Sequence, residues 1–391
     1  MSNLVAIDLP QNNKFLQIIK EVWDNGDAVF VIDQRFSPSL KRQTIGSVKP
    51  KYLIDKDGKN TLPDSVGVSS NDALIQLTSG TTGYPKSVIH TFDSLKAHGA
   101  MVNEFLKVNP KSDRWIACLP LSHIGGMGVV MRAYFADMPV EIIETPDKTE
   151  LERLNANGYN MVSLVASVLD RINTRSYKAV VIGGMAEPDN VAENIFPTYG
   201  LSESGGGVVY KGECLRGVRI KIQPGSQLIE INSPTLLRAY RSMHESAVGK
   251  NVVSKEGIYP ELDNGYFVTS DCGYFENDRL KILGRRDDLI NTGGEKIWAK
   301  TLEDIILSID GIDQVCVVGL KDQKWGQKIV AAVAKSKDSK ATSEDIIRTV
   351  KDRLASWAVP KEIQFVDDLP KTAILKTDRA AVIKWFYNHQ N

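Results

Sequence analysis

The first two thirds of the chain alternate short runs of apolar residues with longer segments in which apolar residues recur at helical spacing. The apolar runs are rich in branched side chains and have the length of buried strands. The predicted strands are residues 73–78, 115–119, 140–143, 161–165 and 179–182, and the predicted helices are residues 93–106 and 168–174. This rhythm predicts a layered α/β domain with a substantial parallel sheet.

Between Gly212 and Arg285 the pattern changes to short alternating runs separated by Gly, Pro and Asn. The runs are VRIKI, QLIEI, GYFVTSD and LKILG. Alternation of this kind, with turn residues between the runs, predicts an antiparallel or barrel-like subdomain. We therefore expect a β-rich subdomain attached to the α/β layers.

After Arg285 the pattern changes again, to that of a small α+β unit of about 100 residues, a size within the usual domain range. Its predicted elements are a Gly-rich turn at 291–294, helices at 300–308 and 343–354, and strands at 314–318, 328–334 and 362–365. The predicted division is therefore a large N-terminal domain, residues 1–284, and a small C-terminal domain, residues 285–391.

Charge and cysteine content narrow the classes of function. The 48 basic and 48 acidic residues balance, so the chain as a whole has no field that would attract nucleic acid. The four cysteines form no CxxC pair, which favours free thiols in a reducing compartment. The N-terminus lacks the pattern of a secretory signal, and the most apolar stretch, residues 124–143, is interrupted by charges and a proline. We expect a cytoplasmic protein with no integral membrane segment.

The segment LTSGTTGYPKSVIHT, Leu77 to Thr91, carries the strongest chemical signal. Glycines let backbone N–H groups face an anion, hydroxyls donate further hydrogen bonds, and a lysine adds charge. The residues concerned are Thr78, Ser79, Gly80, Thr81, Thr82, Gly83 and Lys86. A loop of the form GxxxxGK(S/T) needs glycine before the lysine and a helix starting there, and here Pro85 precedes Lys86. A polar turn is the alternative, but this composition favours a loop that grips the phosphates of ATP.

SGTTGYPK resembles the phosphate loop of the adenylate-forming superfamily, which includes acyl-CoA synthetases, adenylation domains of peptide synthetases and luciferases. Further motifs follow in the order of that superfamily over most of the chain. They are VVIGGMAEP at 180–188, TYGLSESG at 198–205, GYFVTSDCGYF at 265–275, LGRRDDLINTGGEKI at 283–297 and LPKTAILKTDR at 369–379. The resemblance implies an ATP-dependent, AMP-forming enzyme with a mobile C-terminal domain.

The resemblance also implies roles for residues around the nucleotide. Gly183, Gly184 and Met185 would line the adenine and acyl pockets, and Tyr199, followed by Gly200, would stack on adenine. Ser202 would bind the α-phosphate, and Glu203 would be a ligand of Mg²⁺. For Tyr199 a place in the core is an equal alternative.

The remaining implied roles concern the ribose and the C-terminal domain. Asp271 would accept the ribose hydroxyls, Arg285 would reach ribose and phosphate, and Asp287 would be the hinge. Lys376 would stabilise the charge that develops during adenylation. Leu375 stands where the superfamily commonly has glycine, which narrows the backbone choices of that loop.

Two residues point toward the acid substrate. His123, in LPLSHIGG, matches a histidine that CoA ligases of the superfamily carry near the acyl pocket; a histidine satisfied by backbone groups is an equal alternative. Arg132 suits a second carboxylate on the substrate, unless it lies on the outside of a helix. With about 75 residues before the phosphate loop, the chain resembles the compact o-succinylbenzoate–CoA ligases of menaquinone biosynthesis.

The predicted reaction therefore uses ATP, Mg²⁺ and coenzyme A, with a small carboxylic acid as substrate. Three alternatives remain: another acyl- or aryl-CoA ligase, an adenylation enzyme that loads a carrier protein, and a catalytically silent homologue. Intact Lys86, Glu203, Asp271 and Lys376 argue against the last of these. The sequence leaves open whether the chain forms a homo-oligomer.

Overall fold

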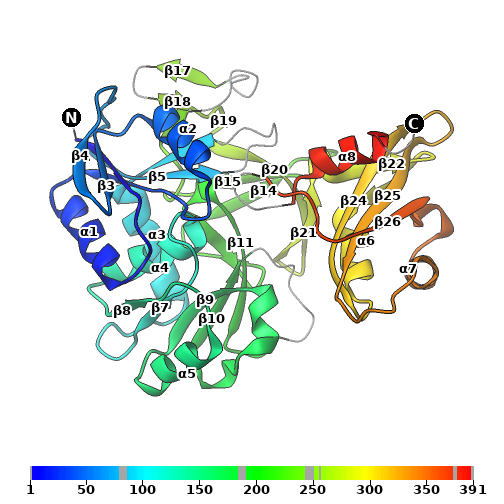
Figure 1. Ribbon diagram of the computed structural model, residues 1–391, viewed down its shortest axis with the longest axis horizontal. Coiled ribbons are helices and arrows are strands. Elements are labelled where there is room, and N and C mark those ends of the chain that lie inside the picture. Colours follow the sequence, from blue (N-terminus) through cyan, green and yellow to red (C-terminus); the bar gives the residue numbers. More distant parts are fainter. Residues whose placement is uncertain are drawn as a thin grey trace. The chain divides into compact units, whose positions relative to one another are not determined.

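A computed structural model describes residues 2–78, 86–183, 191–242, 251–254, 257–372 and 377–388 (Figure 1). The chain divides into two compact units. The first consists of Met1–Lys221, Glu230–Val268 and Phe275–Lys281, and the second of Ile222–Ile229, Thr269–Tyr274 and Ile282–Asn391. The predicted domain boundary after residue 284 stays a prediction.

A nine-stranded sheet forms one layer of the first unit, in the order β17-β18-β16-β6-β5-β2-β1-β3-β4. Its strands are β1 (Leu4–Ile7), β2 (Ala28–Val31), β3 (Tyr52–Asp55), β4 (Gly58–Thr61), β5 (Asp72–Thr78), β6 (Lys86–Thr91), β16 (Ala239–Ser242), β17 (Val252–Ser254) and β18 (Gly257–Tyr259). The central strands β3, β1, β2 and β5 run parallel. Strands β1, β2 and most of β5 are buried throughout, as continuous apolar strands covered on both faces should be.

A second, seven-stranded sheet has the order β13-β12-β11-β10-β9-β7-β8. Its strands are β7 (Trp115–Ala117), β8 (Val140–Ile142), β9 (Met161–Val165), β10 (Ala179–Gly183), β11 (Ile195–Leu201), β12 (Gly206–Tyr210) and β13 (Glu213–Cys214). The five strands from β8 to β11 are parallel, so the predicted parallel sheet is confirmed.

Two helices lie between these sheets (Figure 1). Helix α3 (Phe92–Phe105) packs against β5 and β6, and helix α4 (Ile124–Phe135) packs against α3, β7 and β9. A capping box between Thr91 and Ser94 fixes the start of α3. Both helices therefore bury most of their surface in the middle layer. The other helices of this unit are α1 (Asn13–Asp24), α2 (Pro38–Val48) and α5 (Lys148–Ala156).

The predicted helix at residues 168–174 is wrong. The backbone instead forms two short 3-10 helices, Ala166–Arg171 and Thr174–Ser176. Asn173 separates them, and its side chain accepts a hydrogen bond from the backbone N–H of Arg175 at 3.2 Å. Asparagine competes in this way with helical hydrogen bonding, so the apolar spacing alone was misleading.

The β-rich region is divided between two sheets. Strands β14 (Arg219–Ile222), β15 (Leu228–Asn232), β20 (Tyr266–Glu276), β19 (Leu262–Asp263) and β21 (Arg279–Arg285) form a sheet of their own. Strand β16, from the middle of the same region, pairs with β6 and extends the nine-stranded sheet. Arg238 fixes this extension through a bidentate ion pair with the buried carboxylate of Asp72 at 2.7 and 2.9 Å.

The second unit is built on a five-stranded sheet, β23-β22-β25-β24 with β26 beside β25. Its elements are β22 (Leu289–Thr292), β23 (Glu295–Trp298), α6 (Ala299–Leu307), β24 (Ile312–Asp322), β25 (Gly326–Lys335), α7 (Ser343–Arg353), β26 (Glu362–Val366) and α8 (Arg379–Asn388). Val317 and Ile329 pack with α6 and α7 in one apolar core, while Cys316 and Val330 pack with α8 in another. The alternation along each strand thus covers both faces of the sheet.

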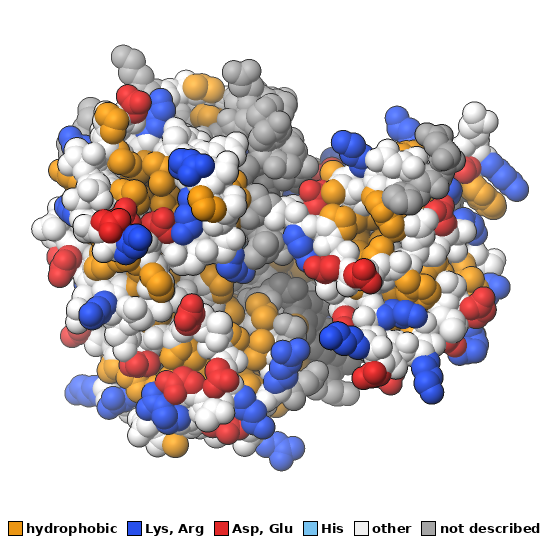
Figure 2. Space-filling view, in the orientation of Figure 1, with side chains coloured by type: hydrophobic (Ala, Val, Ile, Leu, Met, Phe, Trp, Pro, Cys, Tyr) orange, Lys and Arg blue, Asp and Glu red, His pale blue; other side chains and the backbone are white. Residues whose placement is uncertain are grey.

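On the face drawn in Figure 2, acidic and basic side chains are interspersed over each unit. Within the described ranges, no helix combines the length and the apolar character needed to cross a membrane.

Candidate functional site

The second sheet places several candidate residues at the carboxyl ends of its parallel strands. In a parallel sheet all strands end at the same side, and ligands of open α/β sheets bind beyond these carboxyl ends. Gly183 ends β10 in register with Val165 at the end of β9 and with Thr198 on β11, and Tyr199 follows Thr198. His123 lies in the segment that follows β7 and begins α4. The exposed Val165 was not predicted as a site residue, yet it occupies the same edge.

Strands β5 and β6 flank the predicted phosphate loop. Thr78 ends β5 and pairs with Lys86, the first residue of β6, in an antiparallel register. Lys86 therefore begins a strand, in contrast to the helix that a GxxxxGK(S/T) loop requires. The hydroxyl of Thr78 is buried and has no hydrogen-bond partner among the described residues. Ser79, Gly80, Thr81, Thr82 and Gly83 lie outside the described residues, as do Gly184 and Met185.

Tyr240 of β16 brings Lys86 and Glu203 to one place. The Lys86 ammonium lies 5.5 Å from the centre of the Tyr240 ring. The hydroxyl of the same tyrosine donates to Glu203 Oε1 at 3.3 Å. Burial, and then the Glu203 carboxylate, raise the pKa of Tyr240 far above its usual range, so the phenol remains a donor. Tyr240 therefore contacts both a cation and a carboxylate, which are the side-chain types suited to binding phosphate and a divalent cation.

Two histidines that the sequence analysis missed support the segment carrying Ser202 and Glu203. His90 Nε2 donates to the carbonyl oxygen of Ser202 at 2.7 Å, and His98 Nε2 donates to that of Gly207 at 3.0 Å. Both side chains are buried, and burial lowers the pKa of His90 to about 4 and that of His98 to about 3. The signal in the sequence was a histidine beside apolar residues: His90 follows Val88 and Ile89 in β6, and His98 shares a helical face with Leu95 and Met101 in α3.

Gly200 has a steric reason to be glycine. A Cβ at this position would lie 1.9 Å from the carbonyl oxygen of Gly206, on the neighbouring strand β12. The hairpin of β11 and β12 therefore closes only without a side chain here, which presents Tyr199 and Ser202 on either side of the close approach.

Arg132 lies in the interior, so the alternative of an arginine on the outside of its helix is wrong. It is 4% exposed, its Nη2 donates to Ser163 Oγ at 3.0 Å, and its guanidinium lies 4.5 Å from the centre of the Trp115 ring. Nε of Arg132 and Nε1 of Trp115 have no hydrogen-bond partner in the described part of the chain. No carboxylate of that part lies within ion-pairing distance, and burial lowers the pKa of Arg132.

Asp271, Arg285 and Asp287 belong to the second unit. Asp271 lies on β20, where its backbone N–H donates to Thr269 Oγ1 at 3.0 Å. Arg285 ends β21, and its buried Nε has no partner among the described residues. Asp287 lies in the 3-10 helix Arg286–Asp288 that follows directly. The structure thus places the predicted ribose, phosphate and hinge residues on one strand pair and the turn after it.

Arg379 connects the 3-10 helix Arg286–Asp288 to the rest of the second unit. Its guanidinium lies 2.7 Å from Glu303 and 3.3 Å from Asp288, and it donates to the carbonyl oxygen of Val317 at 2.7 Å. Lys376 and Leu375 lie outside the described residues. The ends of their segment are held together by a bridge between Lys371 and Thr377 and by a 2.8 Å hydrogen bond from Asp378 N to Pro370 O.

The predicted CoA-facing segment, Asn291 to Ile297, is a hairpin. Strands β22 and β23 pair across a two-residue turn of Gly293 and Gly294, whose φ angles are 62° and 87°. Two positive φ angles in succession favour glycine strongly, so the Gly-rich turn has a conformational explanation of its own. The role toward CoA stays a prediction.

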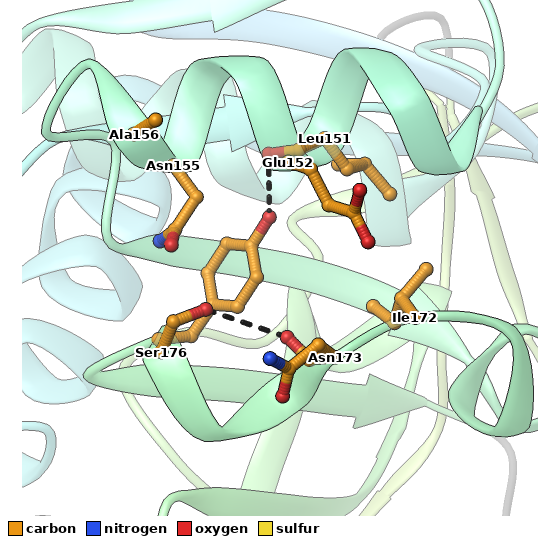
Figure 3. A pocket seen from close by; sticks show the side chains of 8 residues that line it. Leu151, Glu152, Asn155, Ala156, Ile172, Asn173 and Ser176 are labelled. Carbon is orange, nitrogen blue, oxygen red and sulfur yellow. Dashed lines mark hydrogen bonds between the residues drawn. The ribbon is translucent and has the colours of Figure 1, made fainter.

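A small pocket lies between α5 and the 3-10 helix at 174–176 (Figure 3). Tyr177 is one of the residues that line it, and its hydroxyl donates to Leu151 O at 2.9 Å. None of the residues that line the pocket was predicted to bind nucleotide or acid. Side-chain donors of Asn155, Ser176 and Tyr177 are satisfied by backbone carbonyl oxygens, which favours a structural role.

Comparison with known families places this geometry in context. Residues 10–227, more than half of the chain, match the family described as AMP-binding enzyme, and residues 301–376 match the AMP-binding enzyme C-terminal domain. The chain therefore belongs to the AMP-binding enzyme family. The resemblance to adenylate-forming enzymes is confirmed, and the site edge described above lies within the matched residues.

The similar proteins are more specific. The chain is 32% identical to a probable 2-succinylbenzoate–CoA ligase of Mycobacterium tuberculosis over 378 residues, 89% of this chain and 94% of that protein. It is 30% identical over 335 residues to a 2-succinylbenzoate–CoA ligase of Bacillus mycoides, 78% of this chain and 69% of the relative.

A solved structure of o-succinylbenzoate CoA synthetase from Bacillus subtilis, in complex with its acyl-adenylate intermediate, is similar with a TM-score of 0.83. The two chains are 22% identical, and the match covers 97% of this chain and 88% of that one. A structure of the same enzyme with ATP and a magnesium ion also has a TM-score of 0.83. These likenesses confirm the predicted α/β fold class with a smaller C-terminal unit. The roles assigned to individual residues stay predictions.

Proposed function

We propose that this chain is an ATP-dependent, AMP-forming 2-succinylbenzoate–CoA ligase, as in menaquinone biosynthesis. Family membership and the named relatives support the reaction type. The observation that supports the particular acid is Arg132: a buried guanidinium without a carboxylate partner among the described residues suits a substrate that brings a second carboxylate. A cytoplasmic location stays a prediction from the sequence.

In the first half-reaction an oxygen of the substrate carboxylate attacks the α-phosphorus of ATP, the bond to the β-phosphate oxygen breaks, and pyrophosphate leaves. The chain supplies no nucleophile of its own, so its contribution is positioning and charge neutralisation. Thr78 and Lys86 flank the loop that would hold the phosphates. Lys376, from the small unit, would neutralise the charge between the carboxylate and the α-phosphate.

Glu203 suits the magnesium ion that accompanies ATP. Mg²⁺ prefers few protein carboxylates together with phosphate oxygens, and Glu203 stands beside Lys86 through their shared contact with Tyr240. Bound magnesium would neutralise charge on the phosphates. Tyr240 would hold the carboxylate in place by donating its hydrogen bond.

In the second half-reaction the sulfur of CoA attacks the acyl carbonyl, the thiol loses its proton, and AMP leaves with the former carboxylate oxygen. We propose that the small unit turns about Asp287 between the two steps, so that Lys376 leaves and the hairpin of Gly293 and Gly294 takes its place. The glycines at the hairpin tip leave room for the narrow pantetheine arm.

The test is a panel of carboxylic acids in ATP–pyrophosphate exchange, followed by CoA addition and mass analysis of the product. Exchange and thioester formation with 2-succinylbenzoate, and little with benzoate, is the expected result. Exchange without a CoA thioester would point to a carrier protein as acceptor, and exchange only with other acids would point to a different acyl- or aryl-CoA ligase. No exchange with any acid would favour the silent homologue.

Lys376→Ala separates the two half-reactions. We expect adenylate formation to fall by about a thousandfold, the scale of removing a group that stabilises transition-state charge. Thioester formation from supplied acyl-adenylate should remain within a few fold of the unsubstituted chain. Lys371→Ala, near the same segment, is the matched control. Equal loss in both half-reactions would contradict the proposed role of Lys376.

A further inference from the structure

Asp33 and Arg35, just after β2, form a charged pair to which the sequence analysis assigned no role. Asp33 is 4% exposed, and both its oxygens accept hydrogen bonds from Arg35, from Nε at 2.8 Å and from Nη2 at 2.7 Å. The hydroxyl of Ser122 donates to Asp33 Oδ2 at 2.9 Å. Burial by itself opposes ionisation, but the hydrogen bonds from Arg35 and Ser122 hold the pKa of Asp33 well below its usual range. The carboxylate is therefore charged, and both of its oxygens accept hydrogen bonds.

This charged pair lies next to the predicted site. Phe30 of β2 pairs with Ile75 of the parallel strand β5, so Asp33, two residues after the end of β2, lies at about the level of Thr78, the last residue of β5. The segment that carries His123 is held to β5 as well, because Gln76 Nε2 donates to Leu121 O at 3.3 Å.

The backbone of the segment before His123 lies in close contact with the first turn of α4. A Cβ at Gly126 would lie 2.4 Å from the carbonyl oxygens of Leu119 and Pro120. The first turn of α4 therefore packs directly on the backbone before His123, and this packing fixes the position of the backbone that carries the imidazole. Asp33, Arg35, Ser122 and His123 therefore form one hydrogen-bonded cluster in the first unit.

The distances to His123 decide its tautomer. Nε2 lies 2.8 Å from Arg35 Nη2 and 3.3 Å from Asp33 Oδ2. A guanidinium only donates hydrogen bonds. At 2.8 Å Nε2 must therefore be the acceptor, and in the neutral ring the proton sits on Nδ1. If Nε2 carried a proton, it would have to face Asp33, and the guanidinium would be pushed away.

We propose that Asp33 and Arg35 are positioning residues that hold His123 as its Nδ1–H tautomer, so that the ring offers Nδ1–H as a hydrogen-bond donor to an oxygen of the acyl substrate. Asp33 orients the guanidinium with two parallel hydrogen bonds, and Arg35 then fixes the imidazole. The part that concerns the substrate rests on the proposed function, while the tautomer does not.

The tautomer can be measured directly in the full-length chain by ¹⁵N–¹H NMR of the imidazole rings. The chain has only five histidines, and His123→Asn assigns the signal of His123. His90 and His98 are internal references of the opposite kind, because each donates from Nε2 to a carbonyl oxygen. We expect the Nδ1–H form at His123.

Arg35→Met should shift His123 toward the Nε2–H form, because Nε2 is then free to donate to Asp33. Arg35→Lys should retain part of the Nδ1–H population, since an ammonium also only donates. The references at His90 and His98 should not change, which shows that each variant is folded. An Nε2–H form in the unsubstituted chain, or no change in Arg35→Met, would overturn the proposal.

The donor to the substrate is tested by two substitutions at His123 itself. The amide nitrogen of asparagine stands about where Nδ1 was, whereas that of glutamine stands about where Nε2 was. We expect His123→Asn to retain roughly tenfold more kcat in adenylate formation than His123→Gln, and Arg35→Met to lower kcat by about tenfold with the KM for ATP unchanged.

Equal activity of the Asn and Gln variants would reject Nδ1–H as the donor even if the NMR result holds. Failure of the proposed function would look different, because 2-succinylbenzoate would then not be activated by the unsubstituted chain, while the tautomer would remain as described.

Discussion

Arg132 and Arg379 are both largely removed from solvent, but their surroundings differ in one respect. Arg379, with 29% of its side chain exposed, faces the carboxylates of Glu303 and Asp288. Arg132, at 4% exposed, meets a serine hydroxyl and the face of an indole, and no carboxylate of the described residues. The pKa of Arg379 is raised although burial opposes this, whereas burial lowers the pKa of Arg132.

From this difference we propose that Arg379 is a structural cation and that Arg132 binds the substrate. Breaking a buried ion pair leaves an uncompensated charge and costs several kcal/mol, whereas removing a lone buried charge relieves a penalty. Arg379 should therefore matter mainly for stability and Arg132 mainly for the substrate. Substituting both with methionine, which is similar in length and uncharged, tests the comparison on equal terms.

Arg132→Met should give the largest effect. We expect kcat/KM for 2-succinylbenzoate to fall by about a thousandfold, roughly 4 kcal/mol, because the second carboxylate would lose its cation in a buried site. The same variant should change the activity toward benzoate, which has no second carboxylate, by no more than a few fold. The measurement is the kinetics of pyrophosphate release with each acid.

The stability of Arg132→Met provides the control. The free energy of unfolding should stay the same or rise, because a cation without a carboxylate partner is replaced by an apolar side chain. A fall of several kcal/mol, or equal loss of activity with both acids, would mean that Arg132 is structural after all.

Arg379→Met should have the next largest effect, on stability. Glu303 and Asp288 would lose their shared cation, and we expect the free energy of unfolding to fall by about 3 kcal/mol in urea titrations. The negative charge of Glu303 would then be uncompensated, although its Oε1 would still accept a hydrogen bond from Val317 N at 2.9 Å. Arg379→Lys, which keeps the charge and loses the fork geometry, should recover part of the loss.

Local patterns predicted most of this molecule well. The phosphate-loop strand, the parallel strands of the second sheet and the two helices α6 and α7 each follow from a run of residues contiguous in sequence. The burial of Arg132 was also signalled, because α4 (Ile124–Phe135) is apolar all round apart from this residue. A helix without a polar face is expected to be buried on all sides.

Contacts between distant segments could not be predicted in this way. Tyr240 joins Lys86 to Glu203 only because β16 leaves the β-rich region and pairs with β6. Likewise, Asp33 after β2 meets Ser122 and His123 before α4, although 89 residues separate Asp33 from Ser122 in the sequence. Neither pairing leaves a trace in the spacing of residues along the chain.

The smallest predicted effect concerns the pH dependence of stability. It also tests the comparison of the two arginines, because His98 is a buried base beside Arg132. Burial, and then the cation of Arg132, lower the pKa of His98 from 6.5 to about 3. Below pH 6.5 the unfolded chain therefore binds a proton at His98, whereas the folded chain does not bind this proton until the pH approaches 3. The contribution to stability is complete above pH 6.5 and is lost as the pH falls toward 3.

His98→Gln tests this, because an amide can still donate to Gly207 O but does not titrate. From pH 7 to pH 5 the unsubstituted chain should lose about 2 kcal/mol more of its free energy of unfolding than the variant. In Arg132→Met the same loss should be smaller, since the neighbouring cation is gone and His98 accepts its proton more readily. An unchanged pH dependence in both variants would show that His98 and Arg132 do not interact, and would remove the electrostatic part of the contrast between the two arginines.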